Sequence, residues 1–142
     1  MRQWMCDPRF LCQKHICGEH FEMHLFLGSI KLRVSMSGYL YKNLFEPLSL
    51  KSRHDELVIE MKNRNMNHKT ELNYDNDIFS YLGIEKNITI DKRKSLFDLL
   101  TRCKKCRERF LSVVHLHQLS GRTGYEDIIH VIESLNEGTS QS

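Results

Sequence analysis

Apolar residues recur every three or four positions along much of this chain, which is the period of a helix that buries one face. The first apolar stripe consists of Cys12, Ile16, Met23 and Leu27. Before the stripe, Asp7 offers a capping oxygen and Pro8 suits a first helical turn, and after it Gly28 is a stop signal. This pattern predicts a first helix from about residue 7 to residue 27.

The same spacing continues beyond an irregular stretch at residues 29–47. Ser49 and Asp91 are placed to begin two further long helices. An Asn-rich loop at residues 63–76 and a turn at residues 120–124 separate the helical segments. The helices predicted in this part of the chain cover residues 50–64, 77–82, 91–114 and 125–135.

Length and composition favour one all-α domain. A chain of 142 residues, 40% hydrophobic and 27% charged, can bury a core but has no room for a second domain of ordinary size. Residues 88–90 form the only β-branched run, so strands are not expected. We expect a compact bundle of three to five helices with long connecting loops over residues 1–136, and a flexible tail at residues 137–142.

Membrane insertion and secretion are disfavoured. No apolar run approaches the length of a membrane span, and the first residues lack the apolar stretch of a signal peptide. The five cysteines are an odd number, which is typical of free thiols in a reducing compartment. We therefore expect a cytoplasmic protein.

The net charge of +3 hides an uneven distribution. Residues 1–69 carry 11 basic and 7 acidic groups, and residues 92–109 carry eight basic and two acidic groups. Residues 70–91 and 110–142 are acidic overall. The two basic blocks could form one face that binds a polyanion, or they could line an ordinary solvated helix surface.

A polar trio lies beside the first apolar stripe. His15, Glu19 and Glu22 are spaced four and three residues apart, so they share one side of the first helix. Such a trio is often only the exposed edge of a helix, but it could also supply a general acid or base.

Three segments together resemble the pyrimidine-dimer DNA glycosylases with AP-lyase activity, the endonuclease V-like family of phages and bacteria. They are MRQW at the start, QKHICGEHFEMHLFLGSI at residues 13–30 and LSLKSRHDELVIEMKNRNMNHKT at residues 48–70. The resemblance covers about half of the chain. It implies an all-α enzyme that repairs damaged double-stranded DNA in bacterial or phage-infected cytoplasm without a metal or organic cofactor, and we expect a monomer.

In this family the N-terminal α-amine attacks the sugar C1′ of the damaged nucleotide, a Schiff base forms, and β-elimination cuts the strand. An α-amino group has a reference pKa of about 7.7–8.0 against about 10.4 for lysine, so more of it is neutral and nucleophilic at physiological pH. A nearby carboxylate can act as acid and base in successive steps. By resemblance the amine is that of Met1, Glu22 is the acid/base, and Arg2 contacts a backbone phosphate.

The other candidate DNA contacts come from the resemblance and from the basic blocks. His15 would face the DNA or order the site. Phe21 and Leu25 stand where the best-known family member has arginines, so other cations would have to compensate. The remaining candidates are Lys31, Arg33, Arg53, Arg102 and Arg107.

The segment RCKKCRERFLSVVHLH at residues 102–117 combines a CxxC pair with two histidines. Cys103 and Cys106 could bind zinc together with His115 and His117, although these histidines are closer together than is usual. If residues 92–114 form one helix, the two thiols lie on adjacent turns of one face and can instead pack as small apolar groups.

Three functional hypotheses therefore stay open. The first is a pyrimidine-dimer DNA glycosylase and AP lyase that uses Met1 and Glu22. The second is a non-enzymatic nucleic-acid-binding module stiffened by zinc. The third is a protein with the family fold that has lost the chemistry, since arginines are absent at positions 21 and 25.

Overall fold

The described part of the chain is helical. The computed structural model describes residues 1–117 and 124–140, with the backbone alone for His117 and for residues 136–140. No strand is present in these residues, which confirms the all-α class. The α-helices and 3-10 helices (η) are η1 (Pro8–Phe10), α1 (Gln13–Lys31), α2 (Ser37–Tyr41), η2 (Pro47–Ser49), α3 (Leu50–Asn63), η3 (Asn76–Asn87), α4 (Lys92–Arg102), α5 (Lys104–His117) and α6 (Glu126–Ser140).

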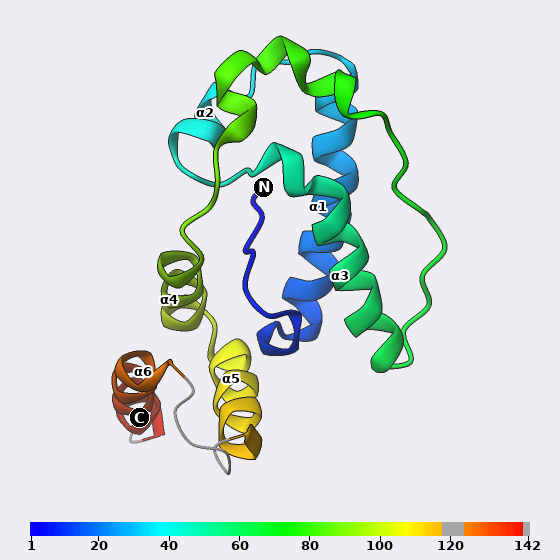
Figure 1. Ribbon diagram of the computed structural model, residues 1–142. Helices are drawn as coiled ribbons and strands as arrows, with labels where there is room; N and C mark the ends of the chain where they lie inside the picture. The colour runs from blue at the N-terminus through cyan, green and yellow to red at the C-terminus, as the bar shows by residue number, and fades with distance from the viewer. Residues whose placement is uncertain (118–123, 141–142) are drawn as a thin grey trace.

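Two groups of helices share the hydrophobic core. α1 and α3 lie side by side, and the N-terminal arm, residues 1–7, runs along them (Figure 1). α4, α5 and α6 pack together as the second group, and η1 packs against α5. One hydrophobic cluster runs through both groups and includes Phe26, Phe45, Phe110 and Ile132, which are all 0% exposed.

The first helix begins and ends later than the sequence predicts. Asp7 caps only the three-residue η1, and Leu11 and Cys12 are extended, so α1 starts at the next residue rather than near residue 7. Gly28 does not stop α1. The left-handed backbone that ends a helix occurs instead at Arg33, whose φ is 54°.

The helix predicted over residues 91–114 is in fact two helices. Asp91 caps α4 as expected, since its Oδ1 accepts a hydrogen bond from the Lys94 backbone N–H at 3.1 Å. The chain leaves helical geometry at Cys103, where φ and ψ are −123° and 111°, and α5 begins at the next residue. Neither Gly nor Pro occurs in this stretch, so no local signal in the sequence predicts the break.

The other helices follow the sequence pattern to different degrees. α3 closely matches the prediction for residues 50–64. η3 extends the predicted helix at residues 77–82 in both directions, with a kink at Gly83, where φ is 62°. α2 lies within the stretch expected to be irregular, and α6 continues to residue 140 instead of ending near residue 135. The turn predicted at residues 120–124 lies mostly outside the described residues, as do the side chains of the predicted tail.

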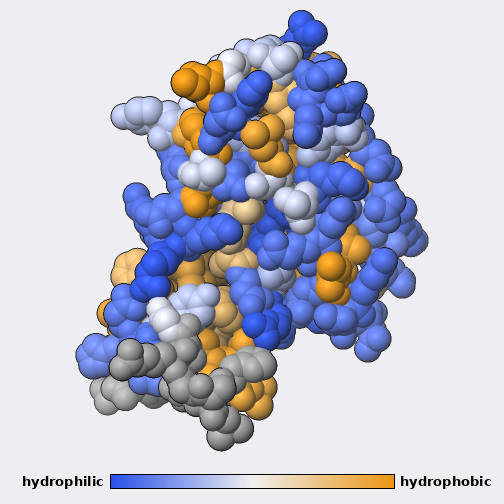
Figure 2. Space-filling view, viewed as in Figure 1, coloured by the Kyte–Doolittle hydropathy of each residue, from blue (hydrophilic) through white to orange (hydrophobic). Residues whose placement is uncertain are grey.

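Polar groups cover most of the surface seen in Figure 2. Apolar side chains form separate small groups on this largely hydrophilic face. On α1, Phe21 is 61% exposed and Leu25 is 40% exposed, so apolar surface adjoins Glu22. None of the described helices is both long and apolar enough to cross a bilayer.

Candidate active site at the N-terminus

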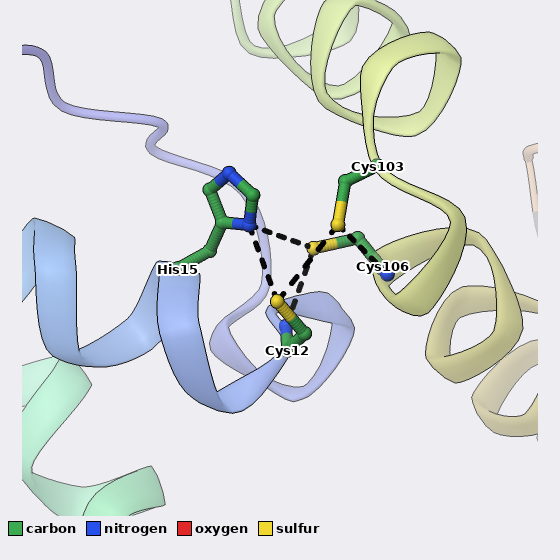
Figure 3. Close-up of side chains that lie close together, drawn as sticks. All are labelled: Cys12, His15, Cys103 and Cys106. Atoms are coloured by element: carbon green, nitrogen blue, oxygen red, sulfur yellow. Dashed lines mark hydrogen bonds between the residues drawn. The ribbon is translucent and has the colours of Figure 1, made fainter.

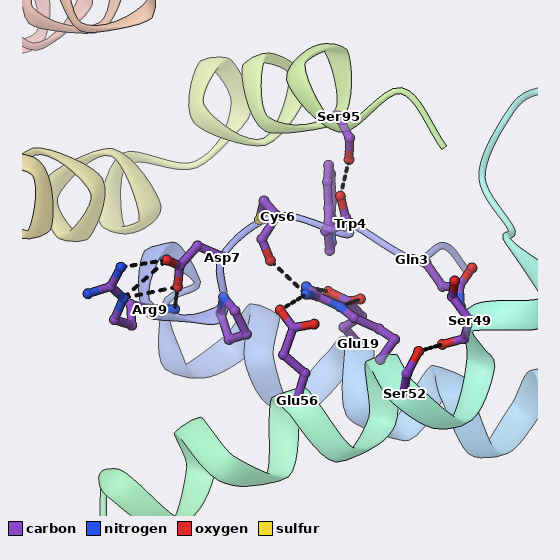
Figure 4. Close-up of polar contacts among 12 residues, drawn as sticks. Gln3, Trp4, Cys6, Asp7, Arg9, Glu19, Ser49, Ser52, Glu56 and Ser95 are labelled. Carbon is purple, nitrogen blue, oxygen red and sulfur yellow. Dashed lines mark hydrogen bonds and ion pairs between the residues drawn. The ribbon is translucent and has the colours of Figure 1, made fainter. Parts of the chain in front are cut away.

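The N-terminal arm lies between the α1–α3 pair and α4 (Figure 4). On one side, the Gln3 side-chain oxygen accepts a hydrogen bond from the backbone N–H of Glu46. On the other side, the Ser95 hydroxyl of α4 donates to the carbonyl of Trp4 (Figure 4). Gln3 is 0% exposed and Trp4 is 8% exposed. The arm is therefore held on both sides, which fixes the position of the amino-terminal residue.

A buried ion pair anchors the arm to both long helices. Arg53 of α3 donates from Nη2 to Oε1 of Glu19 on α1 at 2.8 Å, and neither side chain is exposed. Nη1 of Arg53 donates to the carbonyl of Cys6 in the arm at 2.6 Å and to Glu56 at 3.1 Å. Burial alone would lower the pKa of Arg53, but the hydrogen bonds and the charge of Glu19 raise it. The prediction that Arg53 contacts DNA is wrong, because its guanidinium is occupied inside the protein.

The carboxylate of Glu22 lies beside the start of the chain. Its Oε2 accepts a hydrogen bond from the backbone N–H of Arg2 at 3.0 Å. That N–H belongs to the peptide bond with Met1, so the carboxylate is next to the residue that carries the terminal amine. Met1 is 38% exposed and Glu22 is partly exposed. An amine and a carboxylate arranged in this way can attack an electrophilic carbon and transfer protons.

The side chain of Arg2 is turned into the protein. Its guanidinium carbon lies 3.9 Å from the centre of the Trp4 ring, and Nη2 donates to the hydroxyl of Ser95 at 2.8 Å. Nη1 lies 4.0 Å from Oδ2 of Asp98, and only 14% of the side chain is exposed. Burial lowers the pKa of Arg2. The expected phosphate contact is not available in this arrangement, and Arg2 instead joins the arm to α4.

Two exposed lysines lie close to Arg2. Lys42 and Lys94 line a small cavity of about 50 Å³ that adjoins the side chain of Arg2. Lys94 belongs to the basic block of residues 92–109, whereas Lys42 is isolated in the sequence and reaches this place only through the fold. The sequence pattern did not single out Lys42, because no local signal distinguishes it.

Three of the other predicted DNA contacts are on the surface, and one is not. Lys31 and Arg33 are exposed at the end of α1. Arg102 is exposed at the end of α4, close enough to Arg2 for the two charges to interact. Arg107 is only 6% exposed, and its Nη1 donates to a backbone carbonyl of α4 at 3.0 Å. The prediction that Arg107 contacts DNA is therefore wrong.

His15 faces a cluster of thiols instead of the open surface. Its Nδ1 lies 3.2 Å from Sγ of Cys12 and 3.6 Å from Sγ of Cys106 (Figure 3). Its ring packs edge-on against the ring of Trp4, with the two centroids 5.8 Å apart. Burial lowers the pKa of His15. Of the two roles predicted for His15, its contact with Trp4 favours that of ordering the arm.

The CxxC pair belongs to the same cluster. Sγ of Cys103 lies 3.8 Å from Sγ of Cys12, and the four ligand atoms of the cluster all lie within 4.8 Å of one another. His115 does not belong to this cluster. Its Nε2 lies 3.7 Å from a carboxylate oxygen of Glu133 on α6, and half of its side chain is exposed. Cys12 and His15, rather than His115, lie with Cys103 and Cys106 in this cluster of described residues. The side chain of His117 lies outside the described residues.

A second cluster contains four histidines that the sequence pattern did not single out. His20 and His24 of α1 meet His54 of α3 and His68 of the following loop. Nε2 of His20 lies 3.2 Å from Nε2 of His54, whose Nδ1 lies 2.9 Å from Oδ1 of Asp55. Burial and the neighbouring histidines lower the pKa of His20 to about 4. The spacing of His20 and His24, four residues apart on one helix face, was the one local signal.

Comparison with known proteins identifies the first half of the chain. A family model described as pyrimidine dimer DNA glycosylase matches residues 1–74, just over half of the 142 residues. No curated protein and no solved structure matches the chain. The matched residues include the arm, α1 and α3, and so both Met1 and Glu22. The chain therefore belongs to the pyrimidine dimer DNA glycosylase family, whose members are enzymes of DNA repair.

Proposed function

We propose that this protein breaks the glycosidic bond of a damaged pyrimidine in double-stranded DNA as a glycosylase and then cuts the strand as an AP lyase. The α-amine of Met1 is the nucleophile and Glu22 is the acid/base, and the reaction needs no cofactor. The observation that carries the proposal is the 3.0 Å hydrogen bond from the Arg2 backbone N–H to Glu22, which brings the carboxylate next to the terminal residue. Membership of the family supports pyrimidine dimers as the substrate.

In the proposed reaction the amine of Met1 donates its lone pair to the sugar C1′. The bond between C1′ and the damaged base breaks, its electron pair goes to the base nitrogen, and that nitrogen takes up a proton from water while the base stays linked to the other base of the dimer. Glu22 accepts a proton from the new C1′–N group and returns it to the ring oxygen, so the sugar opens to a protonated Schiff base. Removal of a C2′ proton then expels the 3′ phosphate by β-elimination.

The rigid arm supports this assignment, because a nucleophile held at its target reacts much faster than a mobile one. Glu19 and Glu22 lie on the same helix. Arg53 is paired with Glu19 and also donates a hydrogen bond to the carbonyl of Cys6 in the arm. This buried pair therefore also sets the position of the arm relative to Glu22. The position of the arm beside Glu22 therefore depends on contacts within the protein and does not require a bound substrate.

Exposed cations near the arm support binding to a DNA duplex. Neutralisation of phosphates releases condensed counterions, which supplies much of the affinity of a DNA-binding protein. We expect phosphate contacts from Lys42, Lys94 and Arg102 around the arm, and from Lys31 and Arg33 at the end of α1. Binding should therefore weaken steeply as the salt concentration rises.

Borohydride trapping tests the reaction. Incubation with duplex DNA that contains a cyclobutane pyrimidine dimer or an abasic site should give a covalent adduct, because borohydride reduces the Schiff base to a stable amine. Glu22→Gln should slow strand cleavage about 100-fold or more and keep DNA binding. Glu133→Gln, the same change on α6, is the matched control and should behave like wild type. DNA binding without an adduct on either substrate would instead indicate a family member that has lost the chemistry.

A second variant tests the amine. Adding one residue before Met1 moves the amine away from Glu22, so trapping should be lost while DNA binding is kept. The intact mass of the purified protein identifies its first residue, and peptide mapping of the wild-type adduct should locate the reduced sugar on that residue. An adduct on a lysine side chain would contradict the assignment.

A further inference from the structure

Four side chains bring three sulfur atoms and one nitrogen to a common centre (Figure 3). Cys12 and His15 come from the start of α1, Cys103 from the break between α4 and α5, and Cys106 from the first turn of α5. We propose that these four residues bind a structural zinc ion, which cross-links the two groups of helices. The proposed repair reaction neither requires nor explains this site.

Three distances within the cluster are close to those around a tetrahedral zinc ion. Bonds of about 2.3 Å to sulfur and about 2.0–2.1 Å to nitrogen put the ligand atoms about 3.5–3.8 Å apart around a tetrahedral ion. Sγ of Cys12 lies 3.8 Å from Sγ of Cys103, and Nδ1 of His15 lies 3.2 Å and 3.6 Å from Sγ of Cys12 and Cys106. An ion at the centre would thus meet its ligands after only small side-chain rotations.

The identity and spacing of the ligands favour zinc over other cations. Residues 12–15 form CxxH and residues 103–106 form CxxC, so each pair of ligands comes from about one turn of chain. Three thiolates and an imidazole make a soft set that suits zinc, whereas magnesium and calcium prefer oxygen. Four protein ligands leave no position for water, which is typical of a structural site and not of a catalytic one.

Backbone amides donate to two of the sulfurs. The N–H of Cys12 donates to Sγ of Cys106 at 3.2 Å, and the N–H of Cys106 donates to Sγ of Cys103 at 3.4 Å. Hydrogen bonds to metal ligands orient them and stabilise their charge. Packing of the thiols as small apolar groups would not require amide donors at these sulfurs.

The break between α4 and α5 is an independent observation that points to the same site. It occurs at Cys103 with neither Gly nor Pro nearby, although the flanking residues have a continuous helical pattern. An interrupted helix gives up backbone hydrogen bonds. The extended conformation of Cys103 brings its thiol to Cys12, so a zinc–thiolate bond at this position would offset that loss.

Metal analysis of the full chain tests the proposal. Protein purified under reducing conditions without chelators should contain one zinc ion per chain. Replacement of zinc by cobalt(II) should give the intense visible bands and thiolate charge-transfer bands of tetrahedral thiolate coordination. The absence of zinc, together with no cobalt spectrum after reconstitution of the reduced apoprotein, would overturn the proposal.

Substitutions identify the ligands. Cys103→Ser should abolish stoichiometric zinc binding and lower the Tm, whereas Cys17→Ser, the same change at a thiol outside the cluster, should leave the zinc content unchanged. His15→Cys keeps four ligands and should retain zinc with stronger cobalt charge-transfer bands, so it gives a result even if Cys103→Ser does not fold. Full zinc content in Cys103→Ser, or an unchanged cobalt spectrum in His15→Cys, would contradict the assignment.

Alkylation distinguishes zinc from disulfide chemistry at the same thiols. With zinc bound, Cys12, Cys103 and Cys106 should resist alkylation until a chelator is added, while Cys17 reacts without it. Mass spectrometry of the alkylated, unreduced protein shows for each cysteine whether it is alkylated, unmodified or in a disulfide. A disulfide between any two cysteines of the cluster in freshly purified protein would overturn the proposal.

Discussion

The two halves of the chain contribute differently to the N-terminal site. Residues 1–74, which match the family, supply both groups of the proposed reaction and the buried ion pair that anchors the arm. The residues that follow supply Ser95 and Asp98 of α4, which contact the arm from the opposite side. The half that supplies the groups of the proposed reaction thus depends for its geometry on a half that the family model does not cover.

The two side-chain clusters differ in the same way. The histidine cluster lies wholly within residues 1–74, on α1, α3 and the loop after α3. The cysteine cluster takes two ligands from each half, so it forms only when the two groups of helices are docked. Changes in the first cluster should therefore report on the first half alone, and changes in the second should report on docking.

The largest effect is expected from Arg53→Ala, which leaves the buried carboxylate of Glu19 unpaired and removes the bond to the carbonyl of Cys6. The free energy of unfolding, measured in urea, should fall by about 3–5 kcal/mol. Arg9→Ala breaks an ion pair at the surface and should change the same quantity by less than about 1 kcal/mol. An equally small change in Arg53→Ala would mean that the first half is stable without this pair.

Ser95→Ala tests the dependence of the first half on the second. The variant removes the acceptor of the Arg2 guanidinium and the donor to the Trp4 carbonyl. We expect a loss of about 1–3 kcal/mol in unfolding free energy and a lower rate of borohydride trapping, although Met1 and Glu22 are unchanged. Ser112→Ala, at an exposed position of α5, should alter neither measurement. A normal trapping rate in Ser95→Ala would show that α4 is dispensable for the site.

The histidine cluster predicts a loss of stability in acid. The pKa of His20 falls from a reference value of 6.5 to about 4 in the folded chain, where it faces His24, His54 and His68. The unfolded chain therefore takes up this proton first, so the free energy of unfolding should decrease as the pH falls from about 6.5 to about 4. This contribution should be constant above about pH 7.

Carboxylates also titrate in this range, so the comparison of variants is decisive. His20→Gln should lose less stability than wild type between these pH values, as followed by urea unfolding at each pH. His130→Gln, at an exposed position of α6, should follow the wild-type curve. Identical pH dependence in wild type and His20→Gln would exclude His20 as the titrating group.

Smaller effects are expected from the lysines near the arm. Lys42→Ala and Lys94→Ala should each reduce the slope of log K against log salt by about 1 and weaken DNA binding independently of sequence. Their stability should not change, because both side chains are exposed. Lys69→Ala, at an exposed position of the loop after α3, is the control. Unchanged slopes for both variants would mean that the DNA does not pass over this side of the arm.

The smallest effect is expected at the ion pair between Arg93 of α4 and Asp127 of α6, whose N–O distance is 2.8 Å. Both side chains are largely exposed, so salt and side-chain entropy leave such a pair little net effect on stability. The Tm of Arg93→Ala should match that of wild type in scanning calorimetry. A clear decrease would show that charge, rather than apolar packing, docks α6 in the second half.

The class and the main helices could be predicted because they depend on local patterns. The period of the apolar residues gave α3 within a residue or two, and Asp91 caps α4 as expected. The position of Glu22 beside the terminus followed from a resemblance that lies within the matched half. These features need only short-range order or a motif of known spacing.

The features that could not be predicted depend on contacts between distant residues. Cys103 lies 91 positions from Cys12, and no sequence period records that contact or the helix break that it accompanies. The inward positions of Arg53 and Arg107 have a similar cause, because charged residues are mostly exposed unless they find buried partners, and the sequence does not reveal those partners. Knowledge of the pairing between α1 and α3 would have been needed to place Arg53.

The bond between Ser95 and the carbonyl of Trp4 also has a consequence for the order of biosynthesis. Ser95 is translated 91 residues after Trp4. Until α4 has emerged from the ribosome, the arm can pack against α1 and α3 but lacks its contacts with Ser95 on the opposite side. A chain stopped before α4 would contain both groups of the proposed reaction but would hold the arm from one side only, so full trapping activity is expected only from chains translated beyond that point.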